Sequence, residues 1–313
     1  MWLLVGATAL AAAGITVGVT LATRTVPPSA TSALPKQKGA PELDLDLGVR
    51  TDPEAVALRR ALTLYARGHL KQAGAIFARY DSFEAQVGAS LAAWPGGFDR
   101  LAGLARAHPK SSLGQLELGL AFFWQNRIAQ AESAWRKAAR LQPDTSYAVR
   151  AGDFLHPRDA PGLPPFSPSF DAPAKLADLS PPQRFAALRA EARSGGAHAK
   201  LLYGAALQQL GRPVSAEREF AAAALAAPKD PDAQVAAAVG LFDKARPALA
   251  FSRLGPLVKA FPHAVTVRFH LGLMLLWIGQ LKDAKVQLER VVAAGPSPFL
   301  ADTKLLLTKI AAK

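Results

Sequence analysis

Cysteine is absent from this sequence of 313 residues. Its absence excludes disulfide-stabilised scaffolds, thiolate-bound zinc or iron–sulfur sites and cysteine nucleophiles. The phosphate-binding motif G-x-x-x-x-G-K-[S/T], the dinucleotide motif G-x-G-x-x-G and the zinc-protease motif H-E-x-x-H are also missing. None of the six histidines pairs with another histidine or a carboxylate at ligand spacing on one helix. These absences predict a chain that is not an enzyme and that holds no metal or cofactor.

Acidic residues are fewer than basic ones, with 24 Asp and Glu against 37 Lys and Arg, which gives a formal net charge of +13. A basic surface allows a helical array that binds nucleic acid or an anionic lipid surface. The basic residues are spread over many segments, however, and such spacing is typical of a solvated surface. Nucleic acid is therefore not the expected partner.

Charge is also absent from residues 2–22, WLLVGATALAAAGITVGVTLA. As a helix this stretch would span about 31 Å, the thickness of a membrane's hydrocarbon core. It lacks the basic start and the short apolar run of a secretory signal peptide, so we expect one transmembrane helix or uncleaved signal anchor. The alternative is cleavage within residues 29–33, which would release a soluble secreted or periplasmic protein. Arg24, Lys36 and Lys38 favour a cytoplasmic repeat domain, but so few basic residues leave the opposite side open.

Residues 23–53 are rich in Pro, Ser, Lys and Gly, a composition that cannot bury a core and that predicts a linker. Within it, Glu42 to Leu47 alternate acidic residues with leucine. Alternation over so short a stretch is a weak signal, and we expect the solvated end of a linker. The other interpretation is a short strand or a peptide that docks on the basic domain.

Prolines recur at a fixed interval along the rest of the chain. Pro109 and Pro143 are 34 residues apart, and Pro228, Pro262 and Pro296 follow one another at the same interval. An Ala- and Leu-rich stretch of helical character precedes each of them. Proline just after a helix is an expected stop signal, because it cannot continue the hydrogen-bond ladder. The pattern predicts helix–turn–helix units of 34 residues.

Small and large residues hold fixed positions within these units. In the unit from Ser112, Gly119 stands at position 8, with Ala131 at position 20 and Trp135 at position 24. The units from residues 197 and 265 repeat this order, and the unit from residue 231 repeats it more loosely. This 34-residue pattern resembles the tetratricopeptide repeat, although the large aromatic residue that the family has at position 4 is missing in every unit. The resemblance implies an all-α, right-handed α-solenoid of six or seven helix hairpins, preceded here by the single transmembrane helix.

The resemblance also sets the expected domains. We expect an N-terminal repeat block over residues 54–155, a Pro-rich insertion over 156–181 and a C-terminal repeat block over 182–298. Residues 299–313 are expected to form a capping helix with an outer polar face. Two helices, over residues 147–155 and 182–193, would form one hairpin that the insertion splits.

In the tetratricopeptide family the first helix of each hairpin lines a concave face. Residues at the corresponding positions here are unusually apolar and aromatic, which is typical of a groove for an apolar peptide or a partner helix. The alternative is that tight packing, the insertion or the linker fills this face. The candidate partner-binding residues are Leu116, Leu120, Phe123, Trp124, Val239, Phe242, Phe269, Leu273 and Trp277.

These observations predict a non-catalytic scaffold that binds protein or peptide partners at a membrane, to which a single N-terminal span attaches it. A homo-oligomer, in which the partner is a second copy, is compatible with the same pattern. The Ala-, Arg-, Gly- and Pro-rich composition is typical of bacteria with GC-rich genomes.

Overall fold

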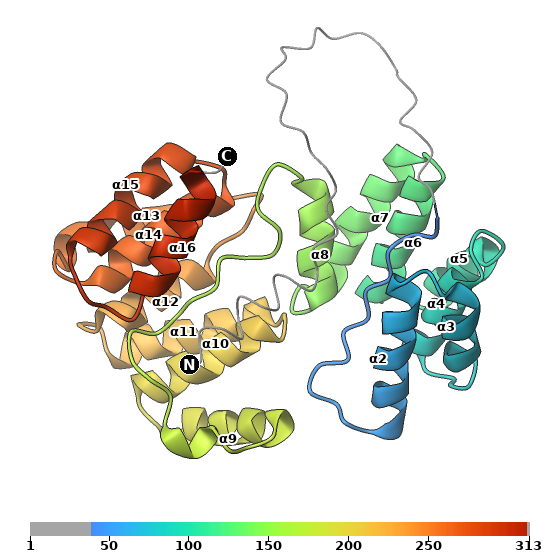
Figure 1. Cartoon of the computed structure of the whole chain (residues 1–313), viewed down its shortest axis with the longest axis horizontal. Helices are drawn as coiled ribbons and strands as arrows, with labels where there is room; N and C mark the ends of the chain where they lie inside the picture. Colours follow the sequence, from blue (N-terminus) through green and yellow to red (C-terminus); the bar gives the residue numbers. More distant parts are fainter. Residues whose placement is uncertain (1–38, 312–313) are drawn as a thin grey trace, which may run out of the picture. The chain divides into compact units, whose positions relative to one another are not determined.

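The computed structural model describes residues 39–311, and every structural statement below concerns this part of the chain. It contains 15 α-helices, one short 3-10 helix and no strand in the described residues. Figure 1 shows the helices in chain order, from α2 in blue to α16 in red. The expected membrane helix at residues 2–22 and most of the expected linker lie outside the described residues. Between residues 39 and 311, no helix is long and apolar enough to cross a membrane.

The helices are α2 (Pro53–Ala66), α3 (Leu70–Phe77), α4 (Phe83–Ala92), α5 (Phe98–Ala107), α6 (Ser112–Trp124), α7 (Ile128–Leu141), α8 (Ser146–Leu155), α9 (Pro181–Ser194), α10 (Ala197–Gln209), α11 (Pro213–Ala226), α12 (Pro231–Gly240), α13 (Ala248–Ala260), α14 (Val265–Trp277), α15 (Leu281–Ala293) and α16 (Leu300–Ala311), with the 3-10 helix η1 (Ala174–Leu176) before α9.

Local signals explain where several helices begin. The side chains of Asp52, Ser111 and Thr145 each accept a hydrogen bond from the backbone N–H three residues later, and so cap α2, α6 and α8. Proline occupies the first turn of α11 and α12, where its missing N–H costs nothing. The 34-residue sequence pattern therefore coincides with real helix boundaries.

In the hairpins α6–α7 and α10–α11, one small residue faces one large residue. A Cβ atom added at Gly119 would lie 2.4 Å from Nε1 of Trp135, and one added at Gly204 would lie 2.4 Å from the ring of Phe220. These are positions 8 and 24 of two different units. The large side chain thus fills the space that the glycine leaves, which lets α6 approach α7 and α10 approach α11 closely.

Consecutive helices pack against each other from α2 to α8 and again from α9 to α16. The expected hairpin between α8 and α9 is not formed, because α8 packs on α6 and α7 whereas α9 packs on α10. The reason is the insertion, which separates the two helices by the 25 residues from 156 to 180. The array is therefore two blocks, α2–α8 and α9–α16.

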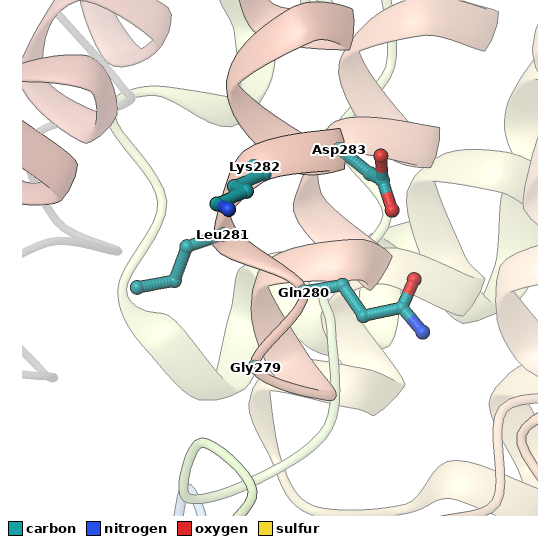
Figure 2. Close-up of a pocket in the computed structure, with 5 residues that line it drawn as sticks. All are labelled: Gly279, Gln280, Leu281, Lys282 and Asp283. Carbon is teal, nitrogen blue, oxygen red and sulfur yellow. The ribbon is translucent and has the colours of Figure 1, made fainter. Parts of the chain in front are cut away.

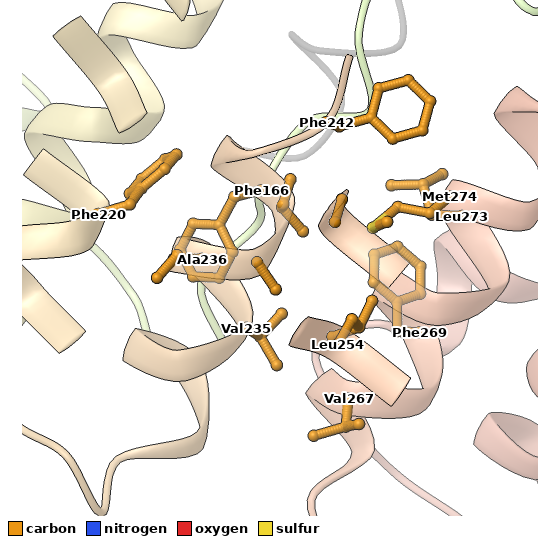
Figure 3. Close-up of a cluster of buried hydrophobic side chains, with 14 of the residues drawn as sticks. Phe166, Phe220, Val235, Ala236, Phe242, Leu254, Val267, Phe269, Leu273 and Met274 are labelled. Carbon is orange, nitrogen blue, oxygen red and sulfur yellow. The ribbon is translucent and has the colours of Figure 1, made fainter. Parts of the chain in front are cut away.

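Two separate apolar cores correspond to the two blocks. The N-terminal core collects buried side chains from Leu45 to Ala151, and the C-terminal core collects them from Phe166 to Phe299. Figure 3 shows the C-terminal core, with Phe166 of the insertion among side chains such as Phe220 and Val235. Each core therefore includes side chains from a segment outside the repeats.

Candidate binding surfaces

The candidate groove residues are mostly covered. Seven of the nine are at most 8% exposed, namely Leu116, Leu120, Val239, Phe242, Phe269, Leu273 and Trp277. Phe123 and Trp124, at the end of α6, are only half-buried. The structure distributes the nine residues over two surfaces, with four on α6 and five on and around α12 and α14. Segments of the chain itself lie over both surfaces.

The first covering segment, residues 40–47, is called the N-terminal strap. It is extended and lies on the first helices of the N-terminal hairpins, before α2 (Figure 1). The side chains of Leu45 and Leu47 are 7% and 6% exposed. The expectation of a solvated linker end is therefore wrong, because both leucines enter the N-terminal core.

Polar groups of α2, α6 and α8 hold the backbone of the strap. The backbone N–H of Asp44 donates to Glu117 Oε1 at 3.0 Å, and the N–H of Asp46 donates to the hydroxyl of Tyr147 at 2.8 Å. The hydroxyl of Tyr65 donates to the carbonyl of Pro41 at 2.6 Å. Backbone groups along an extended peptide are thus bound by side chains from separate helices, which is a peptide-binding arrangement.

Glu117 is the most unusual of these groups. Its side chain is fully buried, and its second oxygen, Oε2, has no hydrogen-bond partner among the described residues. Burial raises the pKa of the Glu117 carboxyl well above its usual range, and the nearby carboxylates of Asp44 and Glu42 act in the same direction, against Arg150. Burial also raises the pKa of Asp44.

Ion pairs tie the strap to both blocks. Glu42 pairs with Arg150 of α8 at 2.7 Å, and Asp46 pairs with Arg212, in the turn between α10 and α11, at 2.6 Å. Asp46 also accepts a hydrogen bond from the hydroxyl of Ser146 at 3.1 Å. The strap therefore covers the N-terminal block and also binds the C-terminal block through Asp46.

The second covering segment, residues 160–170 of the Pro-rich insertion, is called the insertion segment. It follows α8 as an irregular chain, drawn in green in Figure 1. Phe166 is 3% exposed, stacks on the ring of His270 with centroids 5.1 Å apart, and meets the ring of Phe220 edge-on at 5.3 Å. Phe170 stacks on His198 at 4.1 Å.

Side chains of α10, α12 and α14 bind the backbone of this segment. The N–H of Phe166 donates to Gln208 Oε1 at 2.8 Å, and the N–H of Ser167 donates to His270 Nε2 at 3.0 Å. Ser169 donates twice to Asp232 Oδ2, from its N–H at 2.7 Å and from its hydroxyl at 2.6 Å.

Further contacts hold the first residues of the insertion segment. The indole N–H of Trp277 donates to the carbonyl of Gly162 at 3.1 Å, and the ammonium of Lys244 donates to the carbonyl of Ala160 at 2.6 Å. Lys244 also pairs with Asp153 of α8, although its own side chain is only 4% exposed. The segment is thus held along its whole length.

His270 is a neutral hydrogen-bonding residue in this arrangement. Its Nδ1 lies 2.8 Å from the carbonyl of Thr266, to which it donates, so Nε2 is free to accept from Ser167. Complete burial lowers the pKa of His270 to about 4, although the bond to Thr266 and the charge of Asp232 act the other way.

Sequence reasoning found the apolar residues of these surfaces and missed most of the polar ones. Gln208, Asp232 and His198 stand at concave-face positions of their units, but Glu117, Tyr147 and His270 had no assigned role. The available signal was a polar residue within an otherwise apolar helix, as in α6 and α14. Such a residue needs a buried partner, which a sequence does not identify.

No other part of residues 39–311 offers a better site. The hollow in Figure 2 has a volume of about 420 Å³ and is lined by residues 279–283, in the turn before α15. It carries one cation, one carboxylate and no buried polar group directed into it. No cluster of three or more His, Asp or Glu residues that could bind a metal occurs among the described residues.

No protein-family model matches the sequence, and no curated protein shows significant similarity to it. Among solved structures, a chain of the APC/C hetero-tetramer Cut9–Hcn1 is 15% identical, with a TM-score of 0.34, over 82% of this chain and 49% of that one. A tetratricopeptide repeat protein from Parabacteroides merdae is 12% identical, with a TM-score of 0.34, over 83% and 99% of the two chains. Yeast Tom70 is 12% identical, with a TM-score of 0.33, over 83% and 54%.

These TM-scores are too low to carry an argument, and this chain spans only about half the length of the Cut9–Hcn1 chain. The assignment of a tetratricopeptide-like array therefore rests on the 34-residue register and on the packing of positions 8 and 24. Both are properties of this chain.

Proposed function

We propose that this chain is a non-catalytic scaffold that binds protein or peptide partners through the inner faces of its helix hairpins. One observation carries the proposal. On both inner faces, side chains of the helices accept hydrogen bonds from the backbone N–H groups of an extended peptide. Surfaces of this kind are complementary to the backbone of an extended peptide and not to the apolar face of a partner helix.

The end of α6 supports a contact with a partner outside the two covered surfaces. Phe123 and Trp124 are half-buried and lie next to each other, with ring centroids 5.8 Å apart. The indole N–H of Trp124 is itself buried and has no hydrogen-bond partner among the described residues, so the contact would be made by the exposed parts of the two rings. Aromatic side chains that are partly exposed are frequent anchors of protein interfaces.

The test is site-specific photo-crosslinking in the native host. A photoreactive phenylalanine at Phe123 or Trp124 is expected to crosslink a discrete protein. The same residue at Leu225, which is 84% exposed on α11, is the control and should give no discrete product. Phe123→Ala with Trp124→Ala, introduced together, should abolish capture of that protein and leave helix content unchanged. Unfolding of the double variant, or equal crosslinking from Leu225, would contradict the proposal.

We also propose that the scaffold acts at a membrane, to which residues 2–22 attach it. The length and the uncharged composition of that stretch support this. Carbonate extraction separates an anchored chain from a released one, because only an inserted helix stays in the membrane pellet. Protease protection of a tag after Lys313 in spheroplasts then determines the side, since only an outward-facing tag is digested. A soluble, shorter mature chain would contradict the anchor and favour the secreted form.

A further inference from the structure

The inner face of the C-terminal block binds a main chain at defined points. Three acceptors point at the insertion segment, Gln208 Oε1, His270 Nε2 and Asp232 Oδ2, and each comes from a different helix. Within residues 39–311, the only donors that meet these three atoms belong to the insertion segment. With the segment in place Asp232 and His270 are 2% and 0% exposed, so these two acceptors are satisfied by the peptide and not by water.

The spacing of the donors defines which peptide fits. The acceptors meet the N–H groups of Phe166, Ser167 and Ser169. Proline, which has no N–H, stands at 164, 165 and 168, where no acceptor faces the backbone. Proline also holds the chain extended before it binds, which reduces the entropy lost on binding.

Side-chain contacts add a sequence requirement. Phe166 enters the space between Phe220 and His270, Phe170 covers the exposed ring of His198, and the hydroxyl of Ser169 reaches Asp232. These contacts are made by residues 166–170, so the sequence that fits the surface is Phe-Ser-Pro-Ser-Phe. An apolar helix placed on the same surface would leave the buried carboxylate of Asp232 and the imidazole of His270 without partners, at a large cost in affinity.

The insertion segment is bound in the way that a peptide ligand is bound, and it does not pack as a helix of a repeat. It has no regular secondary structure, it lies between α8 and α9, and Ser169 is exposed although its hydroxyl is bonded. We propose that this surface binds an extended, proline-containing Phe-Ser-x-Ser-Phe peptide of a partner protein, and that the insertion segment occupies the site until such a peptide displaces it. The inference rests on the proposed scaffold function and adds the class of ligand.

The insertion segment is part of the same chain as the surface, so it competes strongly with a free peptide for binding there. Short flexible tethers give effective concentrations on the order of millimolar, so a free peptide of equal intrinsic affinity binds the unmodified chain far more weakly than a chain whose own segment is impaired. The comparison of these two chains is therefore the most informative measurement.

The experiment uses the full chain in mild detergent and a fluorescent peptide with the sequence of residues 160–171, followed by anisotropy. Phe166→Ala with Ser169→Ala weakens the resident segment and leaves the surface intact. This variant should bind the peptide at least about 10-fold more tightly than the unmodified chain. In the variant background, Gln208→Ala should weaken binding about 5-fold or more, because one backbone hydrogen bond is lost. Gln209→Ala, at the adjacent exposed position, is the matched control and should have no effect.

If the segment variant does not fold, hydrogen exchange on the unmodified chain gives the answer. Excess peptide should accelerate exchange of the amides of residues 166, 167 and 169, because they lose their acceptors, whereas a peptide with both phenylalanines replaced by alanine should not.

Failure of the peptide to bind the folded variant, or unchanged exchange at millimolar peptide, would overturn the inference. So would a swapped dimer in light scattering, since the occupant would then be a second copy. Crosslinking at Phe123 tests a surface of the N-terminal block. The scaffold proposal can therefore hold even if the peptide does not bind the C-terminal block.

Discussion

The carboxylate of Asp46 accepts a hydrogen bond of 2.6 Å from the guanidinium of Arg212, a residue 166 positions later in the chain. Asp46 belongs to the N-terminal strap, and Arg212 lies in the turn between α10 and α11 of the C-terminal block. The pair is partly buried, with side chains 12% and 32% exposed. Consecutive helices do not pack across the junction between α8 and α9, so this contact is one of the few that join the blocks.

A double-mutant cycle of Asp46→Asn and Arg212→Gln is expected to give a coupling free energy of about 1 kcal/mol in urea unfolding, because the pair is shielded from solvent on one side. The exposed pair of Glu132 and Arg136, four residues apart on α7, is the matched control. That pair should give about 0.3–0.5 kcal/mol. Equal coupling energies for the two pairs would mean that Asp46 and Arg212 do not hold the blocks together.

Glu117→Gln is expected to stabilise the chain at neutral pH. The folded carboxyl binds its proton more tightly than the unfolded one, because burial raises its pKa. Its contribution to stability is therefore complete below the unfolded value of about 4.5 and is lost as the pH rises through the folded pKa. Glutamine keeps the acceptor for the N–H of Asp44 and carries no charge at any pH.

Thermal melts of both chains from pH 5 to pH 8 test this prediction. The gain from Glu117→Gln should grow with pH towards roughly 1–3 kcal/mol. Glu132→Gln, at a partly exposed position on α7, is the control and should change stability by no more than about 0.3–0.5 kcal/mol, the contribution of its pair with Arg136. A Glu117→Gln chain that melts lower at every pH would show that the native carboxylate is stabilised by a contact other than the N–H of Asp44.

The insertion segment should detach more easily in mild acid. Burial lowers the pKa of His270 from 6.5 to about 4, so the detached or unfolded state takes up a proton first. The stability that neutral His270 gives is complete above pH 6.5 and is lost as the pH falls towards 4. Between neutral pH and pH 5 the loss is roughly 2 kcal/mol, or about 30-fold in the population of the detached state.

Hydrogen exchange of the Ser167 amide at pH 7.5 and pH 5, corrected for intrinsic exchange rates, measures this change. The groups that face His270 include Asp232 on α12 and Thr266 on its own helix, and Asp232→Asn separates the carboxylate's effect from that of the imidazole. His270→Gln should lower protection at pH 7.5 and remove its pH dependence. A pH dependence that persists in His270→Gln would assign the effect to another group.

Substitution of the glycine at position 8 should separate the effect of packing on stability from the effect of helix propensity. Gly204→Ala places a methyl group 2.4 Å from the ring of Phe220, and overpacking of this kind costs about 1–3 kcal/mol. Gly103→Ala on α5 is the control, because nothing lies within 4 Å of its added Cβ. It should stabilise the chain by about 0.5–1 kcal/mol through helix propensity. Urea unfolding of both variants tests the pair, and two shifts of the same sign would refute the packing argument.

The repeats could be predicted from the sequence because their signals are local and periodic. Gly119 and Trp135 stand in the same 34-residue unit, and the small residue at position 8 already predicts the close approach of the two helices. The sequence pattern predicts Ala131 opposite Gly119, whereas in the structure the ring of Trp135 lies against this glycine. The helix ends follow in the same way from capping residues such as Asp52 and Ser111.

The alternative that the insertion or the linker fills the concave face is confirmed by the burial of Phe166, Leu45 and Leu47, but the contacts that hold these segments could not be predicted in this way. The contact of Asp44 with Glu117 joins residues 73 positions apart, and that of Ser167 with His270 joins residues 103 positions apart. Both involve a backbone N–H, which every residue except proline carries, so the sequence holds no sign of the pairing. The alternation of Glu42 to Leu47 was visible, but six residues do not reveal the surface on which they lie.

The bond between Asp46 and Arg212 also has a consequence during synthesis. At about 5–20 residues per second, the ribosome adds Arg212 roughly ten to thirty seconds after Asp46. During that interval the N-terminal block can fold, but Asp46 has no guanidinium from the second block to bind. The connection between the two blocks is therefore completed late, and a nascent chain stalled before residue 212 would carry a folded first block whose link to the second has not yet formed.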